Sequence, residues 1–356
     1  MKSVGLDIGT NYTKATMDGK EVISFPSIVV YGEEKDWSLT GENKDIYVGE
    51  EALAMVQSLE NVEAMRPLHE GRIMNQSYME LAKHALKMMD IQPDVIATGM
   101  PVKSSKSERE ELAKDIKKEL NADALIYPEP AGTLAQMNTQ TGVCVDIGFG
   151  TTDIAVLSQM EYVRGDTLLL GVDWLYNNLE VLIRKNYGIN ITPEEITKLL
   201  TTPNYELGRI RSGKTIKISH KDVSAEYNKL LKNWLDRIVS RTKLIVEGLS
   251  TDIVDQIVLT GGGSLLPGVY EEFKSNFESI ANVVKPDDPI SSNARGYYQL
   301  TEKLYKAKAD SQKLKESVEE TKQKGKESAA EETKQKGKGK KKEPKESKKK
   351  EVEVKS

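Results

Sequence analysis

The sequence predicts an α/β protein built from two similar lobes, and three observations support this prediction. Runs of β-branched residues alternate with stretches of helical apolar spacing, which is typical of strands and helices packed in layers. A short strand that ends in a glycine turn occurs twice, as G-L-D-I-G-T from residue 5 and as V-D-I-G-F-G-T-T-D from residue 145. The 356 residues suffice for two domains with cores of their own. Two such lobes facing each other would bring both turns to one cleft.

The apolar pattern places the individual elements along the chain. Strands are expected at Val4–Ile8, Asp94–Thr98, Val143–Ile147 and Gln256–Thr260. Helices are expected at Ser77–Met89, Ser107–Leu120, Trp174–Tyr187, Asp222–Leu249, Val269–Phe277 and near Ala294–Tyr305. Ser107 and Glu110 have the spacing of a capping box, in which each side chain caps the backbone of the other residue.

Charge is distributed unevenly between the body of the chain and its tail. Residues 310–356 hold 16 Lys and 11 acidic residues, a net charge of +5, which leaves a net charge of −9 for residues 1–309. By its charge, the acidic body is not expected to bind nucleic acid. Residues 307–356 repeat E-E-T-K-Q-K-G-K and have almost nothing to bury, so this Lys/Glu-rich tail is expected to be disordered.

Two interpretations of the tail stay open. It could make a weak contact with a polyanion such as DNA or an anionic membrane surface. It could also act as a solubilising brush around a polymer, and its mixed charge together with the acidic body favours this second interpretation.

The compartment is expected to be the cytoplasm. The single cysteine, Cys144, cannot form a disulfide within the chain, which agrees with a reducing cytosol. The N-terminus lacks the pattern of a signal peptide, because Asp7 interrupts its apolar stretch. No run of eighteen apolar residues occurs, so no membrane span is expected.

The first glycine turn has the residue types of a phosphate-binding corner. Asp7 ends a strand, and Gly9 lets the backbone turn tightly and approach a phosphate. The N–H groups of Thr10 and Asn11 could then point at phosphate oxygens, and Lys14 supplies a positive charge. The alternative is an ordinary β-hairpin turn, because D-I-G-T alone is a weak signal.

The second turn is denser in the same residue types. Gly148 and Gly150 stand with Thr151 and Thr152 between two aspartates, which indicates a second phosphate cradle. Asp7 and the first of these aspartates, Asp146, would then lie near one phosphate tail. Paired carboxylates at that place most naturally hold Mg²⁺ through water, since Mg²⁺ dehydrates reluctantly. Without a metal, two carboxylates would repel a triphosphate.

A third glycine-rich element lies between an apolar strand and a helix. Gly261, Gly262 and Gly263 follow the strand that ends in Leu259-Thr260, and they leave room for a flat ring against the backbone. The alternative is a flexible β–α loop without a ligand. The order of strand, triple glycine and helix start favours a ligand loop.

These three elements resemble, in order and approximate spacing, the phosphate-1, phosphate-2 and adenosine motifs of the actin, heat-shock chaperone and sugar kinase superfamily. Y-P-E-P-A-G-T-L-A from residue 127 resembles its first connecting helix, and P-D-D-P-I-S-S-N-A-R-G-Y-Y from residue 286 resembles its second connecting segment. F-P-S, Y-V-G-E-E-A, T-G-M-P-V and N-A-R-G-Y, from residues 25, 47, 98 and 293, are most similar to compact prokaryotic actins of the ParM type and their archaeal relatives. The resemblance covers about residues 1–305.

The resemblance implies two actin-like (ribonuclease H-like) lobes, each a mixed sheet flanked by helices, around a nucleotide cleft. It places the first lobe at 1–142, with 289–306 returning to it, and the second lobe at 143–288. It implies an ATPase that binds ATP and Mg²⁺, hydrolyses ATP and self-associates into filaments. Plasmid (DNA) segregation or a cytoskeleton would be the use of such filaments, with an adaptor protein or a DNA-bound complex as a further partner.

The resemblance also implies roles for single residues. Asp7 and Asp146 would hold Mg²⁺ with its waters, and Glu129 would orient the attacking water. Phosphate contacts are implied for Gly9, Thr10, Asn11, Lys14, Gly148, Gly150, Thr151 and Thr152. Adenosine contacts are implied for Gly261, Gly262 and Gly263, and a ribose-side turn for Gly171. For Glu129 the alternative is a helix N-terminal acid that the helix dipole stabilises.

Two other functions stay open at this point. A monomeric phosphotransferase or an exopolyphosphatase-type hydrolase would share both phosphate turns. A kinase also needs a base that faces an acceptor hydroxyl, and no further acid in a substrate-binding segment stands out. A chaperone-like ATPase would need a peptide-binding domain, and only the Lys/Glu-rich tail is available for that role. The choice between ATP and GTP is open as well.

Overall fold

The computed structural model describes residues 1–32, 45–58, 64–69 and 72–308. The chain divides into two compact units, Met1–Glu302 and Lys303–Ser356. Both large sheets lie in the first unit. Of the predicted disordered tail, residues 309–356 lie outside the described residues, whereas residues 307 and 308 belong to a helix. Among the described residues, no helix combines the length and the apolar character needed to span a bilayer.

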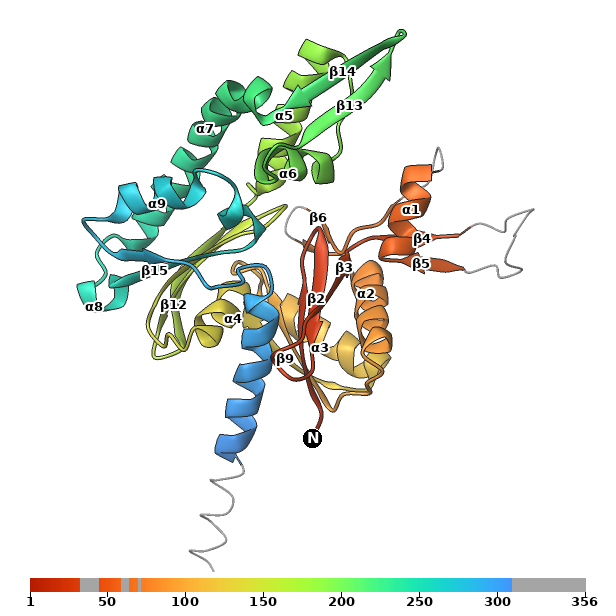
Figure 1. Cartoon of the computed structure of the whole chain (residues 1–356). Helices are drawn as coiled ribbons and strands as arrows, with labels where there is room; N and C mark the ends of the chain where they lie inside the picture. The colour runs from red at the N-terminus through yellow and green to blue at the C-terminus, as the bar shows by residue number, and fades with distance from the viewer. Residues whose placement is uncertain (33–44, 59–63, 70–71, 309–356) are drawn as a thin grey trace, which may run out of the picture. The chain divides into compact units, whose positions relative to one another are not determined.

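The first five-stranded sheet has the order β3-β2-β1-β8-β9. Its strands are β1 (Ser3–Ile8), β2 (Tyr12–Thr16), β3 (Ile23–Pro26), β8 (Val95–Met100) and β9 (Asp123–Pro128). β1, β2 and β3 form an antiparallel meander, while β1, β8 and β9 run parallel. The helices α2 (Asn75–Met88) and α3 (Lys106–Leu120) pack on this sheet and bury an apolar core around Leu6, Leu81 and Ile116. Figure 1 shows these elements in red to orange.

Small elements extend this part of the chain. They are β4 (Val29–Tyr31), β5 (Ile46–Val48), α1 (Glu50–Ser58), β6 (Leu68–His69) and β7 (Arg72–Ile73). A separate apolar cluster around Ile28, Val30 and Ala52 holds α1 against this small sheet.

The second five-stranded sheet repeats the arrangement of the first, with the order β12-β11-β10-β15-β16. Its strands are β10 (Gly142–Ile147), β11 (Thr152–Ser158), β12 (Glu161–Leu168), β15 (Gln256–Thr260) and β16 (Asn282–Val284). The first three are again antiparallel, and β10, β15 and β16 are again parallel. The predicted duplication of a strand–turn unit is therefore confirmed as a duplication of whole sheets.

Helices and one β-hairpin pack around the second sheet. They are α5 (Val172–Tyr187), α6 (Pro193–Thr201), β13 (Glu206–Arg211), β14 (Lys214–Ser219), α7 (His220–Val246), α8 (Thr251–Val254), the 3₁₀ turn η1 (Gly262–Leu265) and α9 (Val269–Phe277). They bury a large core around Trp234, Leu179 and Phe273. The mixed two-lobe α/β fold is confirmed, and the predicted lobe borders at 142 and 288 stay predictions.

Two helices connect the sheets and cross closely. The helix α4 (Glu129–Gln136) follows β9 and leads into β10, and a last helix covers residues 292–308. A Cβ atom on Gly296 would lie 1.7 Å from the carbonyl oxygen of Gly132, so the two backbones touch and only glycine fits there. This crossing fixes where α4 leaves the first sheet.

Most element bounds agree with the sequence prediction, and one cap does not. β15 and α9 have the predicted bounds, and the other predicted strands and helices differ by a few residues at their ends. The predicted capping box of Ser107 and Glu110 is wrong. The N-cap is Ser105, whose side chain accepts from the Glu108 N–H while Glu108 accepts from the Ser105 N–H. The stretch S-S-K-S-E-R-E offers this spacing twice, and the helix begins early enough to use the first.

Candidate functional site

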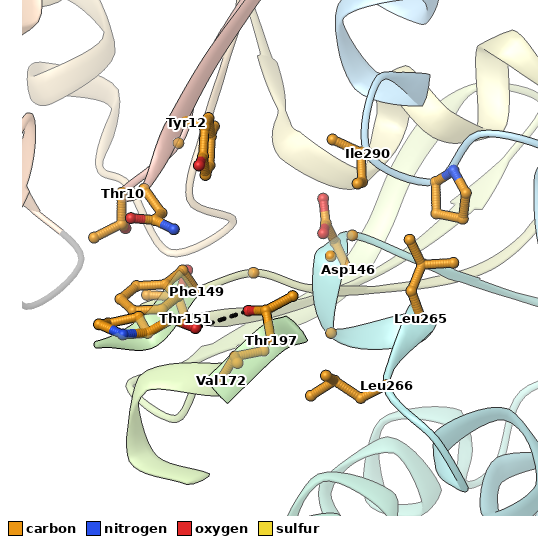
Figure 2. A pocket seen from close by; sticks show the side chains of 18 of the residues that line it. Thr10, Tyr12, Asp146, Phe149, Thr151, Val172, Thr197, Leu265, Leu266 and Ile290 are labelled. Carbon is orange, nitrogen blue, oxygen red and sulfur yellow. Dashed lines mark hydrogen bonds between the residues drawn. The ribbon is translucent and has the colours of Figure 1, made fainter. Parts of the chain in front are cut away.

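A cavity of about 700 Å³ lies between the two duplicated sheets. Figure 2 shows part of its wall from close by, with Thr10 and Tyr12 on one side, and Phe149, Thr151 and Val172 on another. Of the predicted site residues, the cavity is lined by Asp7, Gly9, Thr10, Asn11, Lys14, Glu129, Asp146, Gly148, Thr151, Gly261, Gly262 and Gly263. Segments more than 250 residues apart in sequence therefore share one concave site.

The first glycine turn places a cation beside a carboxylate at the end of β1. Gly9 donates its N–H to the carbonyl of Tyr12 over 3.2 Å, which closes the turn between β1 and β2. Asp7 and Lys14 are paired residues of these strands, and the Lys14 ammonium lies 3.1 Å from Asp7 Oδ2. Both side chains are largely buried, so the pair is held in place at the cavity wall.

The second turn has the same geometry at the end of β10. Gly148 donates its N–H to the carbonyl of Thr151 over 2.9 Å. Asp146 is buried and accepts a 2.6 Å hydrogen bond from the Asn293 side-chain amide. Burial and the negative charge of Asp7 raise the pKa of Asp146 to about 7, although the bond from Asn293 opposes this rise. A cation bound beside Asp146 would lower this pKa again.

The two turns touch each other. A Cβ atom on Gly150 would lie 3.0 Å from the Thr10 hydroxyl oxygen, so the turns approach within ordinary packing distance only because residue 150 has no side chain. The convergence expected from the duplicated motif is therefore present in the geometry.

Three predicted site residues lie behind the cavity wall. Gly150 packs on Thr10 as described, and Thr152 is fully buried and donates its hydroxyl to the Leu170 carbonyl over 2.7 Å. Gly171 forms the N-cap of α5, where a Cβ atom would lie 2.1 Å from the Phe149 carbonyl oxygen. In the described structure these residues set the shape of the second turn, and they are not among the residues that line the cavity.

Glu129 is the first residue of α4 and lines the cavity near the aspartates. Burial, together with the negative charges of Asp153 and Asp146, raises the pKa of Glu129 well above its ordinary value. Its backbone carbonyl accepts a hydrogen bond from the Tyr297 hydroxyl over 2.9 Å. The start of α4 is therefore held in place, and the Glu129 carboxyl group lines the cavity, where it can accept or hold a proton.

The triple glycine forms a tight corner over Asp146. Gly261 has a φ of 79°, and a Cβ atom there would lie 2.3 Å from Asp146 Oδ1. On Gly263 a Cβ atom would lie 2.3 Å from the Ile147 side chain. Gly262 has no atom within 4 Å of its Cβ position, so its face is open to the cavity that it lines. This open backbone face can receive a flat ring.

Sequence reasoning missed one wall of the cavity. It is formed by Tyr176, Pro193, Glu194, Thr197, Lys198 and Thr201, from α5 and α6. Thr197 is fixed by a 2.8 Å hydrogen bond with the Tyr176 hydroxyl. These side chains have no glycine pattern and stand at ordinary helical spacing, so nothing in the sequence marked them.

Asn293 was also missed, although it belongs to the N-A-R-G-Y segment. Besides its bond to Asp146, its side-chain oxygen accepts from the Thr133 N–H at 3.0 Å and the Thr133 hydroxyl at 2.8 Å. The residue thus joins α4, β10 and the last helix. The resemblance of the N-A-R-G-Y segment indicated that Asn293 belongs to the second connecting segment, but it did not indicate that Asn293 binds Asp146 and Thr133.

Magnesium would fit this donor set only with help from a ligand. Among the described residues, no group of three or more His, Cys, Asp or Glu side chains could hold a metal ion alone. Asp7 and Asp146 supply two carboxylates at the cavity, and Mg²⁺ commonly takes one or two carboxylates together with waters and phosphate oxygens. The raised pKa of Asp146 agrees with a place for a cation.

Comparisons with known proteins point in one direction. A family model described as MreB/Mbl protein matches residues 1–309. The cell shape-determining protein Mbl of Bacillus cereus is 27% identical over 303 residues, covering 75% of this chain and 86% of that protein. The solved structure described as a MamK double helical filament has a TM-score of 0.70 at 22% identity, over 84% of this chain and 98% of that one. MreB5 of Spiroplasma citri bound to ADP has a TM-score of 0.68 at 23% identity, over 86% and 98%.

Proposed function

This chain belongs to the MreB/Mbl family, and on that premise we propose that it is an actin-like ATPase that assembles into filaments and organises cell shape. The observation that carries the proposal is the meeting of two glycine turns, a carboxylate pair and an open triple glycine at one cavity. ATP with Mg²⁺ is the ligand that these groups suit best. Related proteins support the assembly part, because one is described as a filament and another as cell shape-determining.

In this proposal different residues of the chain bind the phosphates, the metal ion, the attacking water and the adenosine. The backbone N–H groups of both turns and the Lys14 ammonium bind phosphate oxygens. Asp7 and Asp146 would hold a Mg²⁺ ion, which would supply positive charge beside the phosphate groups. Glu129 orients the attacking water and accepts its proton. Gly262 lets the adenosine lie against the backbone.

The use of the filaments is proposed from the relatives. Cell shape is named for Mbl of Bacillus cereus. No relative named above is described as acting in plasmid segregation, so we favour a cytoskeletal use over that alternative. We place the protein in the cytoplasm on its cysteine content and family, again as a proposal.

Phosphate release and sedimentation with purified protein test the function. Wild-type protein should release phosphate from ATP without any acceptor and should pellet as filaments in ATP. Glu129→Gln should bind ATP and pellet, but release phosphate far more slowly. No filaments over a wide range of protein and salt concentrations would refute the assembly part. A need for an acceptor molecule would favour a phosphotransferase.

The tail is tested separately. We propose that residues 307–356 act as a solubilising brush, because their charges are mixed. Deletion of residues 310–356 should then lower the solubility of filaments and leave affinity for DNA at low salt unchanged. A clear loss of DNA affinity in the deletion variant would instead support contact with a polyanion.

A further inference from the structure

Arg66 reaches the first glycine turn from a separate segment of the first unit. Its backbone is anchored on both sides. The preceding residue, Met65, exchanges two backbone hydrogen bonds with Val29, at 2.8 and 2.9 Å. The carbonyl of Arg66 accepts from the Ser77 hydroxyl over 2.9 Å. The side chain therefore starts from a fixed point on the small sheet.

The guanidinium of Arg66 holds two acceptors of the turn. Its Nη1 donates to the Thr10 carbonyl oxygen over 3.0 Å and to Asn11 Oδ1 over 3.2 Å. Arg66 is half-buried and is absent from the residues that line the cavity, although Thr10 and Asn11 both line it. Burial lowers the pKa of Arg66, and the negative charge of Glu194 opposes this effect. An arginine nonetheless remains charged at neutral pH.

One peptide group connects these contacts to the cavity. The Thr10 carbonyl and the Asn11 N–H belong to the same planar trans peptide, so they point in opposite directions. A carbonyl that is held toward Arg66, behind the wall, turns the Asn11 N–H toward the other side. A carbonyl that turned into the cavity would instead present a negative dipole to the phosphates.

We propose that Arg66 is a positioning residue that fixes the Thr10–Asn11 peptide with its N–H toward the phosphate groups of the nucleotide. Arg66 thereby determines how strongly the phosphate part of the ligand is recognised, without contacting the ligand itself. This proposal rests on the proposed nucleotide function and assigns part of its phosphate recognition to a residue outside the glycine motifs.

Binding of ATP, ADP and adenosine by the full chain tests the proposal, with Mg²⁺ present and calorimetry as the measurement. The variant is Arg66→Met, which keeps most of the apolar stem and removes every donor. Loss of a charged hydrogen-bond donor is expected to weaken ATP and ADP binding about tenfold or more. Adenosine lacks phosphates, so its affinity should stay within about twofold of wild type.

A matched control and a coupling measurement separate positioning from general damage. Arg72→Ala removes an exposed arginine of β7 nearby and should leave all three affinities unchanged. In Arg66→Met/Asn11→Ala the loss in ATP affinity should be smaller than the product of the two single losses, because both variants release the same turn.

The ratio of ATP affinity to adenosine affinity decides between the outcomes. The proposal is overturned if folded Arg66→Met keeps the wild-type ratio, whether both affinities are unchanged or both fall equally. Should Arg66→Met fail to fold, Arg66→Lys is measured instead. Its ammonium can reach one of the two acceptors, so the ratio should fall about threefold, and an unchanged ratio would overturn the proposal as well. If wild type itself bound ATP no better than adenosine, the proposed function would fail before this inference.

Discussion

The crossing of the two connecting helices makes a sharp prediction for Gly296→Ala. A new Cβ atom would lie 1.7 Å from the Gly132 carbonyl oxygen, whereas real Cβ atoms essentially never approach within 3.0 Å. The helices must therefore separate by about 1.3 Å, because the obstacle is rigid helix backbone. Asn293 lies one turn before Gly296, so it moves with the helix.

The cost follows from the bonds that Asn293 makes. Its bonds to Asp146 and Thr133 measure 2.6, 2.8 and 3.0 Å, and a shift of this size takes all three beyond hydrogen-bond range. One bond to a charged group and two neutral bonds contribute about 3–5 kcal/mol. The better helix propensity of alanine returns about 1 kcal/mol. The free energy of unfolding should fall by about 2–4 kcal/mol, and the melting temperature by about 3–6 °C.

Urea unfolding followed by circular dichroism measures this change. Gly208→Ala is the matched control, because no atom lies within 4 Å of its Cβ position, and its stability should stay within about 0.5 kcal/mol of wild type. Phosphate release should also fall in Gly296→Ala, because Asp146 loses its amide partner. A Gly296→Ala protein as stable as wild type would refute the reasoning that the crossing is rigid.

Three further predictions concern the cavity and an ion pair. Glu129→Gln should lower the rate of phosphate release about 10²- to 10⁴-fold and leave ATP affinity nearly unchanged, which stopped-flow and calorimetry can check; an equal loss of both would argue against a role in the chemical step. Removal of Mg²⁺ with a chelator should weaken ATP binding more than adenosine binding, and Asp146→Ala should abolish that difference. Burial alone would raise the pKa of Asp166, but the cations of Lys103 and Arg241 hold this pKa below its ordinary value. The ion pairs therefore stabilise the fold above about pH 4 and are lost as the pH falls below it. Asp166→Asn should be less stable than wild type at pH 7, and the difference should shrink in acid; a constant difference at all pH values would contradict this assignment.

The strands and turns of the fold were predictable because their signals are local. β15 contains a buried apolar run of three residues, Ile257–Leu259, between the polar residues Gln256 and Thr260, and its bounds agree with the prediction. The two glycine turns were predictable for the same reason, since each cradle is built from consecutive residues. Repetition of the motif further predicted that the turns would share one site.

Local patterns do not reveal what a glycine makes room for. Gly262 leaves its backbone open toward the cavity, whereas Gly171 is required by the carbonyl of Phe149 and Gly150 by the side chain of Thr10. All three are simply glycines in the sequence, whether a ligand or another part of the protein approaches them. Only the tertiary structure distinguishes the glycine that faces the cavity from the two that pack against the protein.

By itself the sequence determined the α/β class, the duplicated strand–turn units and the glycine turns that line part of the cavity, because these depend on neighbours within a few positions. Tertiary structure alone decided which distant side chains complete the site. Asn293 reaches Asp146 across 147 positions, and Arg66 reaches Thr10 across 56. Such contacts depend on how whole helices and sheets pack, and packing couples residues that no short-range periodicity connects.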